Sequence, residues 1–538
     1  MPTVPQAIAT DRAQLMARLA EPRHYDVAVV GGGATGLGVA LDAAARGLSV
    51  VLIEAHDFAK GTSSRSTKLV HGGVRYLAQG NISLVREALH ERTLLLANAP
   101  HLAQPLPFVM PTYEWWEAPF YGMGLKMYDL LAGRAGLGHT EFLSADETQA
   151  LLPMVRSKGL KGGVKYWDGQ FNDARMALAL ARTAAARGAL LVNYCRAKEL
   201  IHTDGRVTGV ACQDQLTGQV YAIACGCVVN ATGVWVDELR RQDGDAVGGP
   251  DGPTTPAMVA PSQGVHMVVD REFLGGNTAL MVPKTADGRV LFAVPWLGKV
   301  ILGTTDTPRH DLALEPEPFP DEVDFILSES ARYLRRAPTR ADVKSIWVGL
   351  RPLVKPPKDE GDNTKGLSRE HTILVSRSGL VTVTGGKWTT YRAMAEDVLT
   401  ECAKHSLIKP TASGLTKSLH LIGANSTALR APPLNELEGM HSYGAEQAAV
   451  NDLPGADHWL CAGLSEAMVR FAARYEYAIK VEDVLARRSR LLFLDARLAG
   501  RLAGTVANIL RDETGQDPYQ EEFERLWPHY LLNVTEKV

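Results

Sequence analysis

The sequence has few cysteines. It contains six among 538 residues, and no two of them form a Cys-x-x-Cys pair. Such sparse cysteines are typical of reduced thiols in a protein core, which argues against a disulfide framework and a thiolate metal site. A run of about 18 uncharged apolar residues is also missing, so no membrane-spanning helix is expected. The N-terminal segment lacks the apolar core of a secretory signal, and a cytoplasmic location is predicted.

Neither positive nor negative side chains are in large excess. Lys and Arg total 57 against 60 Asp and Glu, which leaves a formal net charge of −3. Because a broad basic field is missing, a nucleic acid is not expected as the main partner. No segment fits the calcium loop D-x-[DN]-x-[DN]-G, and no metal site is predicted. A chain of this length is expected to form two or three domains.

A segment near the N-terminus predicts a nucleotide cradle. Residues 25–54 lay out an apolar strand, a glycine turn, a helix and a second apolar strand. The turn has the G-x-G-x-x-G pattern, in which glycines allow the tight turn, the approach of backbone to a pyrophosphate and close helix packing. Glu54 ends the second strand, where a carboxylate accepts hydrogen bonds from ribose hydroxyls and repels a 2′-phosphate. The residues of the turn expected to bind the cofactor are Gly31, Gly33, Ala34, Thr35 and Gly36.

Two later segments favour FAD as the dinucleotide. Asn230-Ala231-Thr232-Gly233 follows an apolar strand, and its small residues allow a strand end to pass beside a cofactor. Gly385-Gly386-Lys387 leads from a strand into a helix that is expected to start near Thr389 or Thr390. The N-terminus of that helix would stabilise the negative charge of a reduced flavin. A plain strand exit is the common alternative for the first segment, which supports FAD only together with the others. Taken alone, the second segment is equally a glycine turn with Thr389 or Thr390 as the N-cap.

Periodicity predicts further elements. Strand-like runs at residues 265–269, 280–283, 290–294 and 300–304 alternate without helices between them, which predicts an antiparallel sheet. Helices are expected over residues 82–99 and 172–187, and strands over 190–194, 207–213, 220–225, 227–230, 372–376 and 380–384. From about residue 407 the pattern becomes helical, with strongly periodic stretches at 465–474 and 481–499, so the tail is predicted to be a separate helical domain.

Several motifs stand in one order along the chain: TSSRSTKLVHGGVRYL, FNDARMALA, VVNATGVWV, GVHMVV, ILGTTDTP, GLRPLV and TGGKWTTYR. On these motifs, residues 24–405 resemble the FAD-dependent glycerol-3-phosphate dehydrogenases, and the tail is similar to the C-terminal domain of many of them. The resemblance implies a fold of class α/β and α+β. It comprises a discontinuous Rossmann-like FAD-binding domain (residues 23–81, 165–255 and 349–406), a substrate or cap domain with an antiparallel sheet (82–164 and 256–348) and a C-terminal helical domain (407–538).

The resemblance implies oxidation of sn-glycerol 3-phosphate to dihydroxyacetone phosphate, with hydride transfer to flavin N5 and electrons passed to a membrane quinone. Such chemistry needs cations for the phosphate and a base for the hydroxyl proton. The residues that match the family motifs and are expected to bind the substrate are Arg75, Tyr76, His266, Arg351, Arg369 and Lys387. His266, Arg351 and Lys387 are the predicted catalytic residues. His266 is preferred as the base, although His71 could equally be the base or line the flavin.

The same motifs are expected to surround the cofactor. Besides the first turn and Glu54, the residues predicted to bind FAD are Thr62, Ser63, Ser66, Lys68, Leu69, His71, Gly72, Gly73, Ala231, Thr232, Gly233, Gly386, Lys387, Trp388 and Thr389. The side chains of Arg75, Arg351, Arg369 and Lys387 are expected to converge near the isoalloxazine ring. Asp306 either orients the substrate or cofactor or forms a surface ion pair.

Two positions depart from the family. Gln263 stands where some bacterial members have lysine, so one cationic contact there is absent or replaced. Residues 113–117 carry acids where some relatives have basic, membrane-seeking residues. The nearby apolar side chains of Trp115, Trp116, Phe120 and Met123 form either an interfacial surface or a buried cap over the substrate domain.

The sequence leaves several alternatives open. The electrons could pass to oxygen, as in a glycerol-3-phosphate oxidase. A tRNA-modifying FAD protein and a non-catalytic FAD scaffold are rival functions; the missing basic field argues against the first, and the expected cluster of cations against the second. Peripheral attachment to the inner face of the cytoplasmic membrane is expected, and a homodimer is compatible with the sequence.

Overall fold

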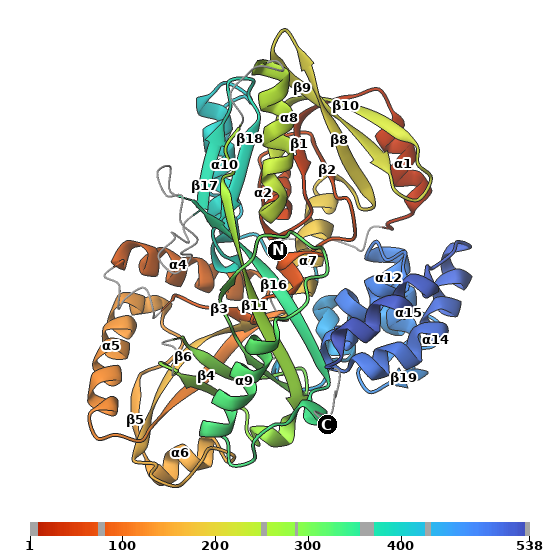
Figure 1. The fold of residues 1–538 in the computed structure, drawn as a ribbon. Helices are drawn as coiled ribbons and strands as arrows, with labels where there is room; N and C mark the ends of the chain where they lie inside the picture. Colours follow the sequence, from red (N-terminus) through yellow and green to blue (C-terminus); the bar gives the residue numbers. More distant parts are fainter. Residues whose placement is uncertain are drawn as a thin grey trace.

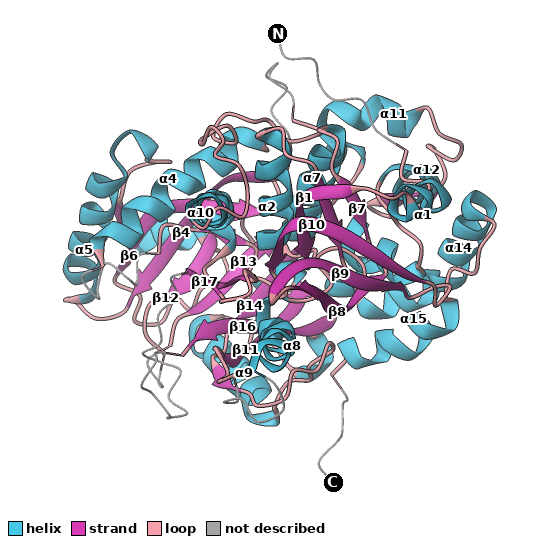
Figure 2. Cartoon of the chain, turned by 90° about the horizontal axis from the view of Figure 1, so that it is seen from above, coloured by secondary structure: helices cyan, strands magenta, loops and turns pink. Residues whose placement is uncertain are grey.

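The computed structural model describes residues 9–73, 81–248, 255–285, 289–355, 371–424 and 432–532. Within these residues the chain forms an eight-stranded sheet, here the first sheet, a ten-stranded sheet, here the second sheet, and a two-stranded pair. Figure 1 shows the first sheet at the top, the second sheet below it and the C-terminal helices, in blue, beside the second sheet. Seen from above in Figure 2, helices flank the strands on both sides.

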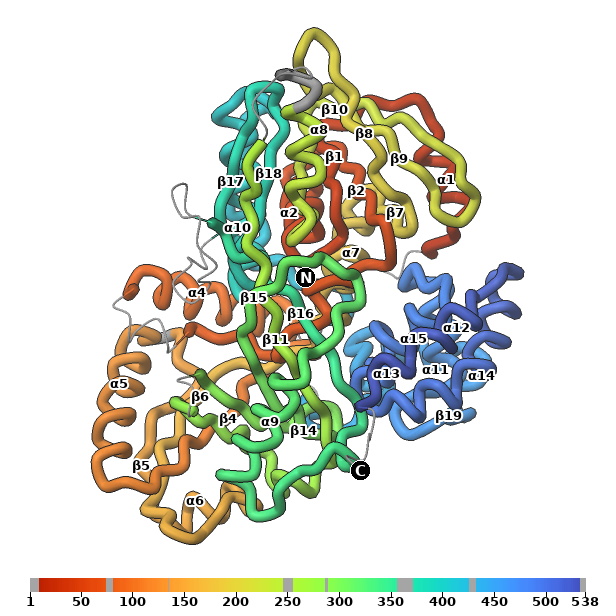
Figure 3. The backbone as a smooth tube through the Cα atoms, in the orientation of Figure 1, coloured from red at the N-terminus to blue at the C-terminus, as the bar shows by residue number. Residues whose placement is uncertain are grey.

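The chain passes several times between the two sheets, as the trace in Figure 3 shows. The first sheet takes its strands from residues 24–53, 190–230 and 371–385, and the second from residues 69–171 and 259–354. Two predicted domain boundaries, at residues 165 and 349, fall inside β6 (Gly162–Phe171) and β16 (Ser345–Val354). Both strands run unbroken through the second sheet, so the exchange between the sheets occurs at their ends.

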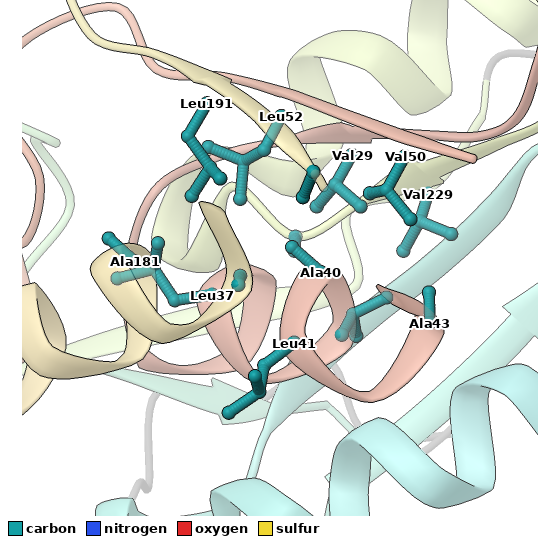
Figure 4. Close-up of a cluster of buried hydrophobic side chains, with 14 of the residues drawn as sticks. Val29, Leu37, Ala40, Leu41, Ala43, Val50, Leu52, Ala181, Leu191 and Val229 are labelled. Atoms are coloured by element: carbon teal, nitrogen blue, oxygen red, sulfur yellow. The ribbon is translucent and has the colours of Figure 1, made fainter. Parts of the chain in front are cut away.

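The first sheet has a parallel centre covered by helices. Its order is β17-β18-β10-β1-β2-β7, and all neighbours from β18 to β7 pair in parallel. Helix α2 packs on this centre; Figure 4 shows its Leu37 and Ala40 close to Val29, Leu52 and Leu191 of the strands. The elements are β1 (His24–Val30), α2 (Ala34–Ala45), β2 (Val50–Ile53), β7 (Leu190–Val192), β8 (Cys195–Thr203), β9 (Arg206–Asp214), β10 (Val220–Asn230), β17 (His371–Val375) and β18 (Val381–Gly385). Strand β8 was not predicted, because most of its side chains are exposed or half-buried and its apolar pattern is weak.

The second sheet is antiparallel with one exception. Its order is β15-β11-β14-β13-β12-β4-β6-β3, with β16 beside β11 and β5 beside β6. The predicted antiparallel pairing is confirmed for β11 to β14, whereas β12 also pairs in parallel with β4. The remaining strands are β3 (Leu69–Val70), β4 (Ala103–Thr112), β5 (Glu141–Ser144), β11 (Val259–Asp270), β12 (Ala279–Val282), β13 (Leu291–Trp296), β14 (Lys299–Gly303) and β15 (Thr307–Pro308).

Most predicted helices form near their expected bounds, but the stretch 481–499 is not one helix. It forms a π-helical turn over Asp483–Arg488, then α13 (Leu491–Leu494) and the start of α14 (Ala496–Thr514). The break occurs at Arg490, whose φ of +58° no helix accommodates. The other helices are α1 (Arg12–Ala20), α4 (Ile82–Asn98), α5 (Glu117–Ala132), α6 (Ala145–Leu151), α7 (Asp173–Ala186), α8 (Val236–Gly248), α9 (Pro320–Tyr333), α10 (Tyr391–Lys404), α11 (Gln447–Asn451), α12 (Glu466–Tyr475) and α15 (Gln520–Leu526); the two-stranded pair is β19 (Trp459–Cys461) and β20 (Leu464–Ser465).

Helix α5 and the residues before it expose an apolar face. The exposed fractions are 81% for Trp115, 45% for Trp116, 63% for Phe120 and 70% for Met123. The alternative in which these side chains form a buried cap is therefore wrong. Among the helices of the described ranges, none combines the length and the apolarity needed to cross a bilayer.

Candidate active site

Two adjoining cavities lie between the loops of the first sheet and the strands of the second. The first-sheet cavity, of about 390 Å³, is lined by segments at the carboxyl ends of β1, β2 and β10. The second-sheet cavity, of about 320 Å³, is lined by residues of β11, β16 and the segment before β3. The residues that line both are Thr62, Pro352, Gly385, Gly386, Lys387 and Trp388. The two cavities are therefore neighbours along one elongated site.

The glycine turn shapes the first-sheet cavity. Gly31 has a φ of +110°, and a Cβ on it would lie 2.6 Å from the carbonyl oxygen of Ala231. A Cβ on Gly36 would lie 1.9 Å from the oxygen of Gly31. Gly33 is the N-cap of α2 and has no side chain to satisfy the first N–H groups of the helix. These residues thus present bare backbone and the positive end of a helix dipole to the cavity.

Glu54 faces the same cavity in a fixed orientation. Its carboxylate accepts hydrogen bonds from the N–H groups of Gly32 (2.6 Å) and His56 (2.8 Å). Burial raises the pKa of Glu54, although these two N–H groups oppose the increase. A carboxylate offers about four acceptor positions, so two backbone bonds leave capacity for the hydroxyls of a ribose.

The second glycine segment lies between the cavities. Gly385 and Gly386 have φ of +83° and +70°, which turns β18 into a short 3-10 helix before α10. The indole N–H of Trp388 donates to the oxygen of Ser63 at 2.8 Å, which ties this turn to the first motif. Thr390 makes no side-chain N-cap bond, whereas the Thr389 hydroxyl accepts from the His71 N–H at 3.3 Å. Thr390 is therefore the N-cap residue of α10, as the alternative interpretation of this turn expected, but its side chain does not cap the helix.

Strands β11 and β16 bring His266 and Arg351 to one cavity. Their antiparallel register pairs Ser262 with Arg351 and His266 with Trp347, which places these side chains on one face of the sheet. Gly264 lies between them, and a Cβ there would be 2.3 Å from Nη2 of Arg351. Glycine at this position therefore allows the guanidinium to extend across β11.

Arg351 is held by oxygen atoms on one side of the cavity. Its guanidinium donates to the carbonyl oxygens of Gln263 (3.0 Å) and Thr305 (2.9 Å). It also pairs with the Asp306 carboxylate at 3.2 Å, while about a quarter of the Arg351 side chain, 24%, remains exposed. Asp306 therefore pairs with Arg351 inside the cavity, which answers the alternative of an ion pair on the open surface.

His266 is buried in the wall of the cavity. Its Nε2 lies 2.9 Å from the Thr67 hydroxyl, and its ring stacks on Trp347 at 5.3 Å between centroids. Burial, together with the charges of Lys68 and Arg351, lowers the pKa of His266 well below its usual value. The imidazole is therefore neutral near pH 7 and has one nitrogen able to accept a proton.

Most residues predicted to bind the cofactor or substrate line the two cavities, but Gly36, Lys68 and Gly72 do not. Lys68 is wholly buried, and its Nζ donates to the carboxylate of Asp173 and the oxygen of Ser64, both at 2.7 Å. The N–H of Gly72 instead donates to the hydroxyl of Tyr128 at 2.9 Å. The amine of Lys68 is thus held by an ion pair in the interior and is not presented to either cavity.

Three predicted substrate residues, Arg75, Tyr76 and Arg369, lie outside the described residues. The convergence of four cations is therefore described only for Arg351 and Lys387, which line the same cavity. Gln263 is buried on the opposite face of β11, where it contacts Glu322 and Arg309. The side chain at this position therefore does not face the cavity.

The structure adds lining residues that the sequence did not indicate. In the second-sheet cavity these include Arg65, Thr67, Phe108, Tyr166, Asp168, Gly264, Met281, Arg289, Val290, Phe292, Thr304 and Thr305. In the first-sheet cavity they include His56, Lys60, Arg196, Trp235, Glu238 and Leu314. Six of these lie inside the quoted motifs and could have been found there: Arg65, Thr67, Trp235, Gly264, Thr304 and Thr305. Asp168 comes from the long strand β6, and only the pairing of strands shows that it reaches the cavity.

The donor set fits FAD. The bare turn at Gly31 and the N-terminus of α2 would hold the pyrophosphate, because a side chain at the turn would collide with backbone. Glu54 would accept from the ribose, and the Gly386–Thr389 segment between the cavities would flank the flavin ring. The structure holds no group of three or more His, Cys, Asp or Glu arranged for a metal within the described ranges.

Comparison with known families agrees with this arrangement. Residues 26–392 match the family described as FAD dependent oxidoreductase, and residues 415–521 match the C-terminal domain of alpha-glycerophosphate oxidase. The first match covers well over half of the chain and contains every segment that lines the two cavities. FAD is therefore the cofactor of this fold.

Individual relatives span nearly the whole chain. A mitochondrial glycerol-3-phosphate dehydrogenase of Arabidopsis thaliana is 40% identical, covering 97% of this chain and 88% of its own length. The human mitochondrial glycerol-3-phosphate dehydrogenase is 39% identical, covering 95% of this chain and 73% of its own. The crystal structure of glycerol-3-phosphate dehydrogenase from Bacillus halodurans, complexed with FAD, superposes with a TM-score of 0.75 at 28% identity, covering 97% of this chain and 98% of its own.

Proposed function

The chain belongs to the family of FAD-dependent glycerol-3-phosphate dehydrogenases, and we propose that it oxidises sn-glycerol 3-phosphate to dihydroxyacetone phosphate and passes the electrons to a quinone. The bound FAD supplies the acceptor for the hydride that leaves the C2 carbon. The residues of the chain then have three tasks: to bind the phosphate, to orient the C2 hydroxyl and to accept its proton.

One observation carries this proposal: Arg351, Lys387 and His266 line one cavity that adjoins the nucleotide cradle. Arg351 has a planar guanidinium suited to two parallel bonds with a phosphate, and its position is held by backbone oxygens. Lys387 lies between the cavities and supplies a second cation. A cationic pair beside a dinucleotide site supports a small phosphorylated substrate.

His266 is our candidate for the base. Its lowered pKa keeps the imidazole neutral, which is the form that accepts the proton of the C2 hydroxyl. The Thr67 hydroxyl at 2.9 Å fixes the orientation of the ring. His71 also lines the cavity and is the alternative base.

The central experiment is anaerobic reduction. The purified protein is expected to show a flavin spectrum that bleaches on addition of sn-glycerol 3-phosphate and does not change with glycerol, which lacks the phosphate. Reoxidation by a soluble quinone analogue but only slowly by air would support the quinone as acceptor. Rapid reoxidation by air would instead support the oxidase, the second candidate, because the C-terminal match is to a domain of an oxidase. A flavin that sn-glycerol 3-phosphate does not bleach would refute the proposed function and leave the scaffold or another flavoprotein class.

We further propose that the exposed face of α5 attaches the protein to the inner face of the cytoplasmic membrane. Trp115, Phe120 and Met123 form an apolar surface of the kind that enters a lipid interface. The double change Phe120→Ser and Met123→Ser is expected to reduce flotation with phospholipid vesicles and to leave reduction of a soluble acceptor unchanged. Unchanged flotation would contradict membrane attachment through α5. If the wild-type protein instead forms a concentration-dependent dimer and the double change disrupts it, a second copy of the chain covers this face.

A further inference from the structure

The substrate loop, residues 62–69, is held from behind by the C-terminal helical domain. Its residues that line the second-sheet cavity are Thr62, Arg65, Ser66, Thr67 and Leu69. The C-terminal helices, coloured blue in Figure 3, pack against α7 and β16. The role of this domain is not explained by the cofactor or substrate residues, all of which precede it in the sequence.

Arg490 provides a polar link from this domain to the loop. Its side chain is wholly buried, and Nη2 donates to the carbonyl oxygen of Ser64 at 2.6 Å. The other end of the guanidinium donates to Ala486 at 2.7 Å, within the π-helical turn of its own domain. Arg490 also adopts the left-handed conformation that interrupts the helix, which is unfavourable for a residue with a Cβ. The helix is thus interrupted at the residue whose side chain contacts the substrate loop.

The contact made by Arg490 is part of a buried hub. Asp173, the first residue of α7, lies 3.4 Å from Arg490 and accepts from Lys68 and the Ser66 hydroxyl, each at 2.7 Å. Lys68 donates in addition to the Ser64 oxygen. Ser64, Ser66 and Lys68 therefore all bond within one cluster that also contains Asp173 and Arg490. Between them, the Thr67 hydroxyl lies within hydrogen-bond distance of His266.

A second contact reinforces the first. Arg65 donates to the hydroxyl of Tyr530 at 2.9 Å and to Glu315 at 2.6 Å. The Tyr530 hydroxyl in turn donates to Glu315 at 2.9 Å. Tyr530 belongs to the last described segment of the chain, so the C-terminal domain contacts the loop at two consecutive residues, Ser64 and Arg65.

We propose that Arg490 is a positioning residue for the oxidation, and that the C-terminal domain serves to hold the substrate loop in its productive conformation. Without Arg490, the Ser64 carbonyl and Asp173 keep Lys68 as a partner but lose the second of two buried cations, and the loop can move. Thr67 would then no longer orient His266. This inference rests on the proposed function for its kinetic consequence, whereas its structural consequence is independent of the substrate.

Arg182 provides a matched control. It is buried at the same interface, where its guanidinium makes two bonds of 2.6 Å to Glu446. It lies more than two turns along α7 from Asp173 and contacts no residue of the substrate loop. If Arg490 only stabilised the interface, Arg490→Met and Arg182→Met would have the same effects.

The experiment compares these two variants in the full-length, FAD-loaded protein. Both are expected to lower the Tm. Only Arg490→Met is expected to accelerate amide hydrogen exchange in residues 62–70, by tenfold or more, and to lower kcat/KM for sn-glycerol 3-phosphate by about 100-fold, mainly through kcat. Arg490→Lys is expected to recover part of both losses. Because Thr62 and Ser63 of the loop also line the first-sheet cavity, kcat is expressed per bound FAD in each variant.

Wild-type exchange rates in residues 62–70 of Arg490→Met would overturn the proposal, as would equal acceleration in Arg182→Met. If Arg490→Met does not fold, Tyr530→Phe decides the question, because it removes one hydroxyl and is expected to accelerate exchange around Arg65 by about threefold. Unchanged exchange in that variant also overturns the proposal. A wild-type protein that sn-glycerol 3-phosphate does not reduce would refute the proposed function, and the exchange comparison would still decide the role of Arg490.

Discussion

The first-sheet and second-sheet cavities adjoin each other but are built from different materials. The first is made largely of backbone: a turn where a Cβ would collide, the N-terminus of α2 and a carboxylate held by two N–H groups. The second is made of side chains from β11, β16 and the substrate loop, which the C-terminal domain supports from behind. The first therefore depends on the absence of side chains, and the second on their charge and position.

The two cavities should therefore respond differently to mutation. Added volume in the glycine turn that shapes the first-sheet cavity should remove the cofactor and with it all activity. Loss of charge in the second-sheet cavity should leave the cofactor bound and remove only the use of the substrate. Four changes follow in order of decreasing effect; the first three separate these two responses, and the fourth tests a property that both cavities share.

Gly36→Ala should have the largest effect. The new Cβ would lie 1.9 Å from the Gly31 oxygen, and because that atom is backbone, the whole turn has to shift. We expect FAD content, measured from visible absorbance, to fall below about a tenth of wild type. Gly124→Ala in α5 is the control: a Cβ there meets nothing within 4 Å, and alanine is the better helix former. Full flavin content in Gly36→Ala would contradict the role given to the turn.

His266→Gln should come second. The flavin spectrum is expected to remain, while kcat falls about 1000-fold because a general base is lost. Because its pKa is below the usual 6.5, His266 is neutral at pH 7, and the decline of wild-type kcat/KM with acid should begin only below about pH 6.5. The variant should show no such decline. If the variant keeps its activity and His71→Gln loses it, His71 is the base.

Arg351→Gln should reduce kcat/KM about 100-fold, since a charge-assisted hydrogen-bonding partner of the phosphate contributes roughly 3 kcal/mol. FAD binding should be unchanged. Arg309→Gln is the control, because Arg309 is a nearby arginine that pairs with Asp311 and lines neither cavity. Loss of FAD in Arg351→Gln would show that this residue supports the cofactor, and would contradict its assignment to the phosphate of the substrate.

The smallest expected effect is on the stability of the protein in acid. The two cavities should contribute in the same way, because each contains a buried histidine with a lowered pKa. Burial lowers the pKa of His56 in the first-sheet cavity to about 4. Below pH 6.5 the unfolded chain binds a proton at this residue and the folded chain does not, so the free energy of unfolding decreases as pH falls towards 4. At pH 5 the decrease is about 2 kcal/mol. His56→Gln should therefore lose less Tm than wild type between pH 7 and pH 5, and an equal loss would show that His56 is protonated in the folded protein.

The sequence predicted much of the fold where the determinants are local. The order of strand, turn and helix from residue 25 to 54, helix α4, helix α7 and the strands β11 to β14 follow from apolar periodicity and glycine spacing. The prediction of one helix over residues 481–499 was wrong for a reason that lies outside this stretch. Its apolar period is helical, but Arg490 takes a left-handed conformation while its side chain binds Ser64, more than 400 residues earlier.

The same distinction applies to the site. Lys68 was assigned to the cofactor from its motif, yet its amine lies in the interior because Asp173 of α7 is there to pair with it. Asp168 reaches the cavity because β6 crosses the second sheet, and no local pattern around it indicates this. Gln263 lies one residue from Gly264 but on the other face of β11, where alternation of side chains directs it towards α9.

By itself, the sequence determined the nucleotide half of this protein. A bare turn, a helix N-terminus and a terminal carboxylate lie within 30 consecutive residues, and backbone sterics act over such short distances. Only the tertiary structure decided the substrate half. The register of β11 against β16 brings His266 and Arg351 together, and buried ion pairs from the C-terminal domain determine the position of the loop that faces them. Charge pairs and strand register join residues far apart in the chain, so they exist only once the fold has formed.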